Sequence, residues 1–172
     1  FSGCSNLAKV TLPESITAIG TTVFNGTAIT SFVYPDKVER IDDRIFLGCQ
    51  KLVSVTAPSA CLHVEEYAFG KCPLCVTYDF SKCKAVPNLY DVNAFENINP
   101  EAKIFVPEAL YADWIEATNW ATYAKHITPA YEMNIGVRPE DYSQGLTFVD
   151  YEDVLMLLDR GACNDSVIVV PE

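Results

Sequence analysis

The chain has 172 residues, of which 49% are hydrophobic, and a formal net charge of −11. The apolar fraction is enough for a folded core and argues against a disordered chain. The negative charge argues against nonspecific binding to nucleic acid, whose phosphates would repel it. No run approaches the roughly 18 apolar residues of a membrane helix, so we expect no membrane insertion. The first residue is Phe1 rather than Met, which predicts part of a longer or processed protein.

An internal repeat occupies the first half of the chain. It aligns four segments at spacings of 23, 22 and 23 residues: Phe1-Ser2-Gly3-Cys4, Phe24-Asn25-Gly26-Thr27, Phe46-Leu47-Gly48-Cys49 and Phe69-Gly70-Lys71-Cys72. Other apolar positions keep the same phase, such as the column formed by Val10, Phe32 and Val55. A fixed period of this length predicts a repeat protein in which each repeat forms one coil of a solenoid.

Each coil is predicted to add one short strand to a parallel sheet. Strand-like composition, with β-branched and aromatic residues, occurs at residues 10–12, 32–34 and 55–57. A proline directly follows each of these segments and ends the predicted strand. One coil cannot bury its own apolar face, so the core requires stacking at a strand spacing of about 4.8 Å. We therefore predict an internal column of phenylalanine rings. Polar side chains between the apolar positions are expected to face solvent.

At these positions the chain resembles the BspA-like leucine-rich repeats, whose pattern reads F-x-x-C-x-x-L-x-x-V-x-I-P-x-x-V-x-x-I-G-x-x-A-F. The match covers residues 1 to about 95, and Ile19-Gly20 and Ala68-Phe69 follow the pattern in phase. Thr27 stands where Cys is usual. The resemblance implies a leucine-rich repeat solenoid that is mainly β, with a parallel sheet of short strands.

A small helical C-terminal cap is expected over about residues 104–128, where the repeat period loosens. We predict a final strand over 104–107, a helix over 108–117 and a second short helix after Asn119. An uncovered last coil would leave a sheet edge and an apolar end open to water. The two tryptophans of this segment, Trp114 and Trp120, are therefore interpreted as a lid.

We divide the chain into a capped array at residues 1–131, a linker at 132–145 and a β segment at 146–172. Glycine, proline and polar residues favour the linker. Within the β segment, residues 154–158 would also suit a helix. The end of this segment resembles the start of another array of the same family. That resemblance favours strands over a helix, and it implies that the segment is the entry cap of a second array.

The cysteines allow a metal or redox site. Cys72 and Cys75 have the CxxC spacing of zinc and redox centres, and Cys61, His63 and Cys83 lie nearby in sequence. Repeat phase favours buried structural thiols instead, because Cys4, Cys49 and Cys72 share one column and the Cys61 and Cys75 columns point inward. A disulfide between Cys49 and Cys72 is geometrically conceivable. The total of seven is odd, which argues against a disulfide-stapled scaffold.

No other cluster predicts catalysis. We expect His63 to face solvent and His126 to end the lid, with no partner at a triad spacing. Adjacent carboxylates at 42–43, 65–66 and 150–153 could collect calcium, but a solvated surface is favoured. Asn25-Gly26-Thr27 matches an N-glycosylation sequon, although the threonine falls in an inward column. We predict no enzyme activity and no cofactor.

The sequence therefore predicts a non-catalytic recognition module that binds a protein or glycan partner through its exposed sheet face. The resemblance implies an adhesin-like role at the bacterial cell surface or in a secreted protein, beside neighbouring repeats of the same longer chain. A phage virion is the alternative location, and an architectural spacer is the alternative function. A zinc or redox site at Cys72 and Cys75 is the third hypothesis. The candidate contact residues are Lys9, Thr11, Thr30, Val33, Ser54 and Thr56.

Overall fold

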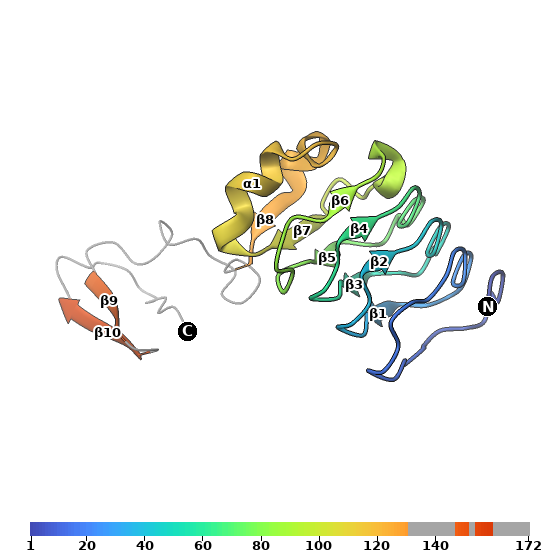
Figure 1. The fold of residues 1–172 in the computed structure, drawn as a ribbon, viewed down its shortest axis with the longest axis horizontal. Coiled ribbons are helices and arrows are strands. Elements are labelled where there is room, and N and C mark those ends of the chain that lie inside the picture. The colour runs from blue at the N-terminus through green and yellow to red at the C-terminus, as the bar shows by residue number, and fades with distance from the viewer. Residues whose placement is uncertain (131–146, 152–153, 160–172) are drawn as a thin grey trace. The chain divides into compact units, whose positions relative to one another are not determined.

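The computed structural model describes residues 1–130, 147–151 and 154–159. The chain divides into two compact units, Phe1–Pro129 and Ala130–Glu172. Figure 1 shows the first unit as a series of stacked coils that end in short helices. Among the described residues, no helix has both the length and the apolar character needed to cross a membrane.

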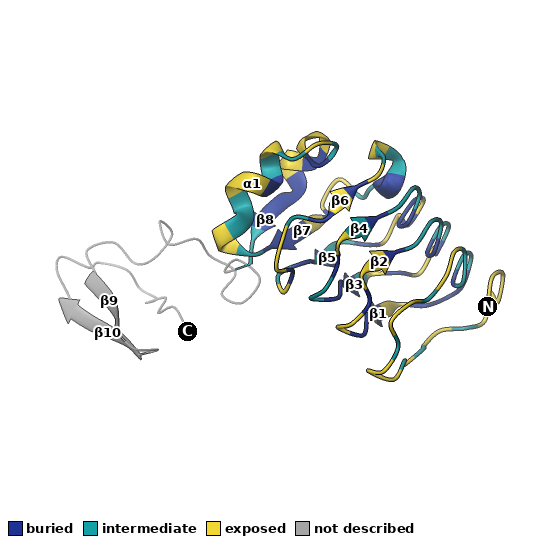
Figure 2. Cartoon of the chain, in the orientation of Figure 1, coloured by how far each residue is buried: buried dark blue, intermediate teal, exposed yellow. Residues whose placement is uncertain are grey.

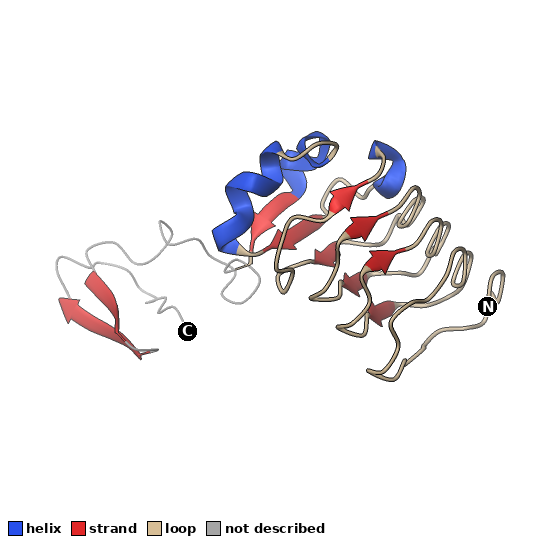
Figure 3. Ribbon diagram, viewed as in Figure 1, coloured by secondary structure: helices blue, strands red, loops and turns tan. Residues whose placement is uncertain are grey.

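Two parallel sheets line the coils of the first unit. One sheet contains five strands in the order β1 (Ser31–Val33), β3 (Ser54–Thr56), β5 (Thr77–Asp79), β7 (Lys103–Val106) and β8 (Ile127–Pro129). The other contains β2 (Arg40–Ile41), β4 (His63–Val64) and β6 (Asn88–Leu89). The strands of the two sheets alternate along the chain up to β7, and Figure 3 shows both sets connected by turns. The predicted solenoid is confirmed, and the second sheet is an addition to the prediction.

The predicted phenylalanine column is confirmed at the centre of the stack. The rings of Phe24 and Phe46 stack with centroids 5.6 Å apart, and those of Phe46 and Phe69 are 6.1 Å apart. Phe1 stacks on Phe24 at 6.2 Å but is 70% exposed. A fifth ring, Phe95, stacks on Phe69 at 5.1 Å. The column therefore continues one coil beyond the predicted repeat.

The predicted strand at residues 10–12 is wrong. No ladder pairing joins this segment to β1, the edge strand of the five-stranded sheet. Two backbone hydrogen bonds, from Gly3 N–H to Asn25 O at 2.8 Å and from Thr22 N–H to Asp43 O at 3.0 Å, link the turns of the first coil to the second. Val10 and Leu12 are only half-buried. The first coil thus packs on its neighbour mainly through apolar side chains.

The predicted cap is confirmed, with one correction. It contains η2 (Glu108–Leu110), α1 (Tyr111–Glu116) and η3 (Trp120–His126), and a further short helix, η1 (Val92–Phe95), precedes β7. Both tryptophans of the predicted lid are fully buried. The predicted final strand at 104–107 is not the last one, because β8 pairs with β7 in parallel through Ile104 and Ile127. The chain therefore returns to the sheet after the helices.

The described part of the second unit is an antiparallel pair of strands, β9 (Thr147–Tyr151) and β10 (Val154–Asp159). The strands expected here are present, and the helical alternative for residues 154–158 is wrong. The linker predicted at 132–145 lies outside the described residues, as do residues 146, 152–153 and 160–172 of the predicted β segment. An entry cap of a second array stays a prediction.

Candidate binding surface

The outward side chains of the five-stranded sheet form two straight rows. Strand pairing aligns Ser31 with Ser54, Ser54 with Thr77, and Thr77 with Lys103. Two residues further along the strands, Val33, Thr56 and Asp79 are aligned in the same way. The residues between the rows point inward and are buried, as strand alternation requires: Phe32, Val55, Tyr78 and Ile104.

The two rows differ in chemistry. Hydroxyl side chains fill three positions of the first row, which ends at the basic Lys103 beside the cap. The second row runs from Val33, which is 67% exposed, through the half-buried Thr56 to the acidic Asp79. Figure 2 shows exposed and intermediate residues on the outside of the coils. The face offers hydrogen-bonding groups at each step and an apolar patch at β1.

Three predicted contact residues, Val33, Ser54 and Thr56, lie on these rows. Thr30 does not, because it precedes β1 and the residue opposite Ser54 is Ser31. Lys9 and Thr11 are exposed on the first coil but belong to no strand. Binding by any of these residues stays a prediction.

Four row residues were not predicted: Ser31, Thr77, Asp79 and Lys103. A usable signal was present in the sequence. Each lies directly before or after a residue of the inward column that contains Phe32 and Val55. Extending that column to Tyr78 and Ile104 would have located them.

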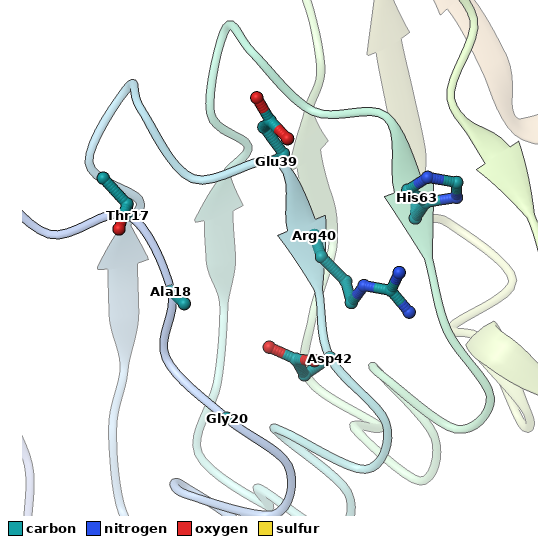
Figure 4. Close-up of a pocket in the computed structure, with 7 residues that line it drawn as sticks. All are labelled: Thr17, Ala18, Gly20, Glu39, Arg40, Asp42 and His63. Atoms are coloured by element: carbon teal, nitrogen blue, oxygen red, sulfur yellow. The ribbon is translucent and has the colours of Figure 1, made fainter.

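A hollow of about 390 Å³ lies beside β2, on the side of the second sheet. Figure 4 shows the Asp42 carboxylate directed toward the first coil and the Arg40 guanidinium directed toward β4. Arg40 Nη1 donates a hydrogen bond of 2.6 Å to Glu65 Oε1. The hollow is lined by residues of three coils: Thr17, Ala18, Gly20, Glu39, Arg40, Asp42 and His63.

Two carboxylates near this hollow, Glu65 and Asp42, are less solvated than expected, whereas Glu39 is exposed. The Glu65 side chain is only 15% exposed and is paired with Arg40. Burial raises the pKa of the Asp42 carboxyl, which Arg40 partly opposes and Glu65 reinforces. His63, expected to face solvent, is half-buried at the rim of the hollow. His126 does end η3, but it is buried with Nδ1 2.8 Å from Ala102 O.

Two of the three column cysteines, Cys49 and Cys72, are buried as predicted, and their thiols bind backbone carbonyls. The prediction is wrong for Cys4, which is exposed on the first coil because no earlier coil covers it. Cys49 Sγ donates to Phe24 O at 3.0 Å, and Cys72 Sγ donates to Phe46 O at 3.1 Å. Thr27, which replaces the usual cysteine, donates its hydroxyl to Phe24 O at 2.9 Å. Each of these groups therefore ties the corner of a coil to a phenylalanine carbonyl. The threonine of the Asn25 sequon has this inward position.

The CxxC pair lacks the properties of an activated dithiol. Burial raises the pKa of Cys72 well above its usual range and that of Cys75 to about 11. A thiol that stays protonated at neutral pH is a poor nucleophile, and metal binding requires the thiolate. In residues 1–130 and the two described strands, no three His, Cys, Asp or Glu side chains are grouped closely enough to hold a metal ion.

Stacked coils, parallel sheets and an internal aromatic column define a solenoid repeat protein. The family model for the BspA-type leucine-rich repeat region matches residues 1–101 in six copies. The chain therefore belongs to the BspA-type leucine-rich repeat family, as the repeat pattern predicted. A comparison with curated proteins gives no match. Repeats of this family act as interaction or repeat modules, are generally non-catalytic and are typical of surface-associated bacterial proteins.

Proposed function

We propose that the chain is a non-catalytic recognition module that binds a protein or glycan partner through the outward rows of the five-stranded sheet. The strand register is the observation that carries this proposal. It holds side chains from successive coils in straight rows. Rigid frames that present variable side chains are the usual binding surfaces of solenoids.

The chemistry of the rows suits a polar partner. The hydroxyls of Ser31, Ser54 and Thr77 follow one another at the strand spacing of about 4.8 Å, and each can donate and accept a hydrogen bond. Sugar hydroxyls and peptide groups both satisfy such a row. The side chains are also short, so little rotamer entropy is lost when a partner immobilises them.

The proposed setting is the bacterial cell surface or a secreted protein, with an adhesin-like role toward a host protein or glycan. Membership in the BspA-type family supports this setting. Neighbouring repeats of the same longer chain would then extend the rows. A phage virion is the alternative setting.

An architectural spacer is the competing function. Its support is that the outward residues are mostly small and polar, whereas aromatic and arginine side chains dominate the strongest contacts of protein interfaces. If the chain is a spacer, substitution of the row residues should leave its function unchanged, because no partner binds there.

A binding screen separates the two functions. The wild-type chain is tested against immobilised glycans and host extracellular proteins, together with a face variant that carries Ser31→Glu, Ser54→Glu and Thr77→Glu. A matched control, Thr21→Glu, Thr118→Glu and Thr122→Glu, adds the same charge at exposed positions outside the rows. We expect the face variant to lose at least about tenfold in affinity and the control to bind like the wild type. Equal binding by all three chains, or no binding partner at all, would favour the spacer.

A further inference from the structure

Cys61 and Cys83 occupy the same position in successive coils. The Cys61 N–H donates to Pro58 O at 3.1 Å, and the Cys83 N–H donates to Phe80 O at 2.9 Å. The N–H groups of Ile16 and Val38 make the same hydrogen bond to the carbonyl three residues earlier, at 3.1 Å each. These four residues therefore form one column of the solenoid. The repeat pattern alone does not reveal Cys83 as a member, because its coil lacks the proline.

Stacking brings the two cysteines within the reach of a disulfide. Successive coils are spaced as parallel strands, about 4.8 Å apart, and the Cα atoms of disulfides are usually about 4.4 to 6.8 Å apart. The side chain of Cys83 also turns back toward the preceding coil, with Sγ 3.6 Å from Pro58 O. Pro58 O is the carbonyl that accepts the Cys61 N–H, so the Cys83 thiol lies at the turn that holds Cys61.

The nearby Cys61 thiol, followed by burial, raises the pKa of Cys83 well above its usual range. The other in-register pair differs in direction. Cys49 and Cys72 each direct Sγ to the phenylalanine carbonyl of the coil before their own, so the two thiols point the same way. Cys61 Sγ instead donates to His63 O of its own coil, whereas Cys83 Sγ turns back to the coil before.

We propose that Cys61 and Cys83 form a disulfide that staples the third coil to the fourth when the protein meets an oxidising thiol pool. The oxidant is a low-molecular-weight disulfide. One cysteine loses its proton and attacks this disulfide, which releases one small thiol and leaves a mixed disulfide. The second cysteine then displaces the remaining small thiol. One sulfur–sulfur bond forms and one breaks, and the two cysteine protons leave with the two small thiols.

Burial sets the conditions of the reaction. Cys61 is 1% exposed and Cys83 is 4% exposed, so oxidation requires the coil to open or takes place during folding. Once formed, the bond is shielded from reductant by the same packing. The cross-link closes a loop of about 22 residues, which restricts the unfolded chain. The proposal is independent of the binding role of the sheet face.

Disulfide mapping tests the proposal. The full chain is purified reduced and incubated with oxidised glutathione at a urea concentration below its unfolding transition. Free thiols are then alkylated, and the chain is digested and analysed by mass spectrometry. We expect one major cross-linked peptide pair, joining Cys61 to Cys83, and a rise of roughly 10 °C in the midpoint of thermal unfolding that reductant reverses.

Two variants provide the comparison. Cys61→Ala should abolish the rise, and Cys49→Ala should retain it. Alkylation of both Cys61 and Cys83 after oxidation would overturn the proposal, and so would a major disulfide between Cys49 and Cys72. The mapping of the wild-type chain decides the question even where a variant folds poorly.

Discussion

The indole Nε1 of Trp120 donates a hydrogen bond of 2.7 Å to the carbonyl oxygen of Pro87. The next residue back, Asn119, donates from Nδ2 to Leu89 O at 2.8 Å. These acceptors flank and belong to β6, the last strand of the second sheet. The cap therefore closes that sheet with side-chain donors, whereas β8 closes the five-stranded sheet with a further strand. In both sheets, backbone groups at the last strand gain hydrogen-bond partners that an open edge would lack.

The tryptophan pair allows this closure to be measured. Trp114 and Trp120 are both fully buried, but the Nε1 of Trp114 has no hydrogen-bond partner among the described residues. Trp120→Phe leaves the Pro87 carbonyl unpaired, whereas Trp114→Phe removes a donor that is already unpaired. We expect Trp120→Phe to lower the free energy of unfolding by about 1 to 3 kcal/mol more than Trp114→Phe does. Equal losses in urea titrations would show that the indole bond contributes nothing.

Thiol labelling tests the structural role of the cysteines. Cys4 is exposed, and the other five described cysteines are buried. In the reduced, folded Cys163→Ala variant, a maleimide should label Cys4 rapidly. Cys72 and Cys75 should react more than about 100-fold more slowly, because labelling requires local opening and a thiolate. Denaturant should make all six thiols reactive. Rapid labelling of Cys72 or Cys75 in the folded chain would instead support the redox hypothesis.

Asp42 predicts a dependence of stability on pH. Burial raises its pKa in the folded state, so the folded chain binds its proton more readily than the unfolded chain does. Stability contributed by this group is therefore lost as pH rises through the window above the ordinary aspartate value of about 3.9. Asp42→Asn should be more stable than the wild type at pH 7, and the advantage should vanish below that value. The control Glu14→Gln, at an exposed residue, should change stability at neither pH.

Local periodicity was sufficient to predict the solenoid and the buried rings, because a phenylalanine recurs at a fixed phase. The lid tryptophans were predicted instead from the need to cover the last coil. It was not sufficient for strands of two residues. Arg40–Ile41 contains a single inward side chain and so shows no alternation. Phe95 was missed because it follows Phe69 by 26 residues rather than 23. The strand β8 follows a helix directly, and only its pairing with β7 reveals it.

The candidate surface was predicted less completely. Val33 and Thr56 directly follow inward residues and lie on the rows, whereas Thr30 lies two residues before the inward Phe32 and falls outside them. The Arg40–Glu65 pair joins residues on neighbouring coils, and the sequence gives no direct indication of such a pair. Contacts of this kind depend on how far one coil is shifted against the next, which the hydrophobic pattern does not determine.

The comparison of Phe46→Ala with Phe1→Ala tests the stacked column most directly. Phe46 is fully buried between Phe24 and Phe69, whereas Phe1 stacks on one ring only and remains largely exposed. In urea unfolding monitored by circular dichroism, we expect Phe46→Ala to cost about 3 to 5 kcal/mol. Phe1→Ala should cost less than about 1 kcal/mol, because little of its surface is removed from water. Equal costs for the two substitutions would contradict an inward column of stacked rings as the frame of this protein.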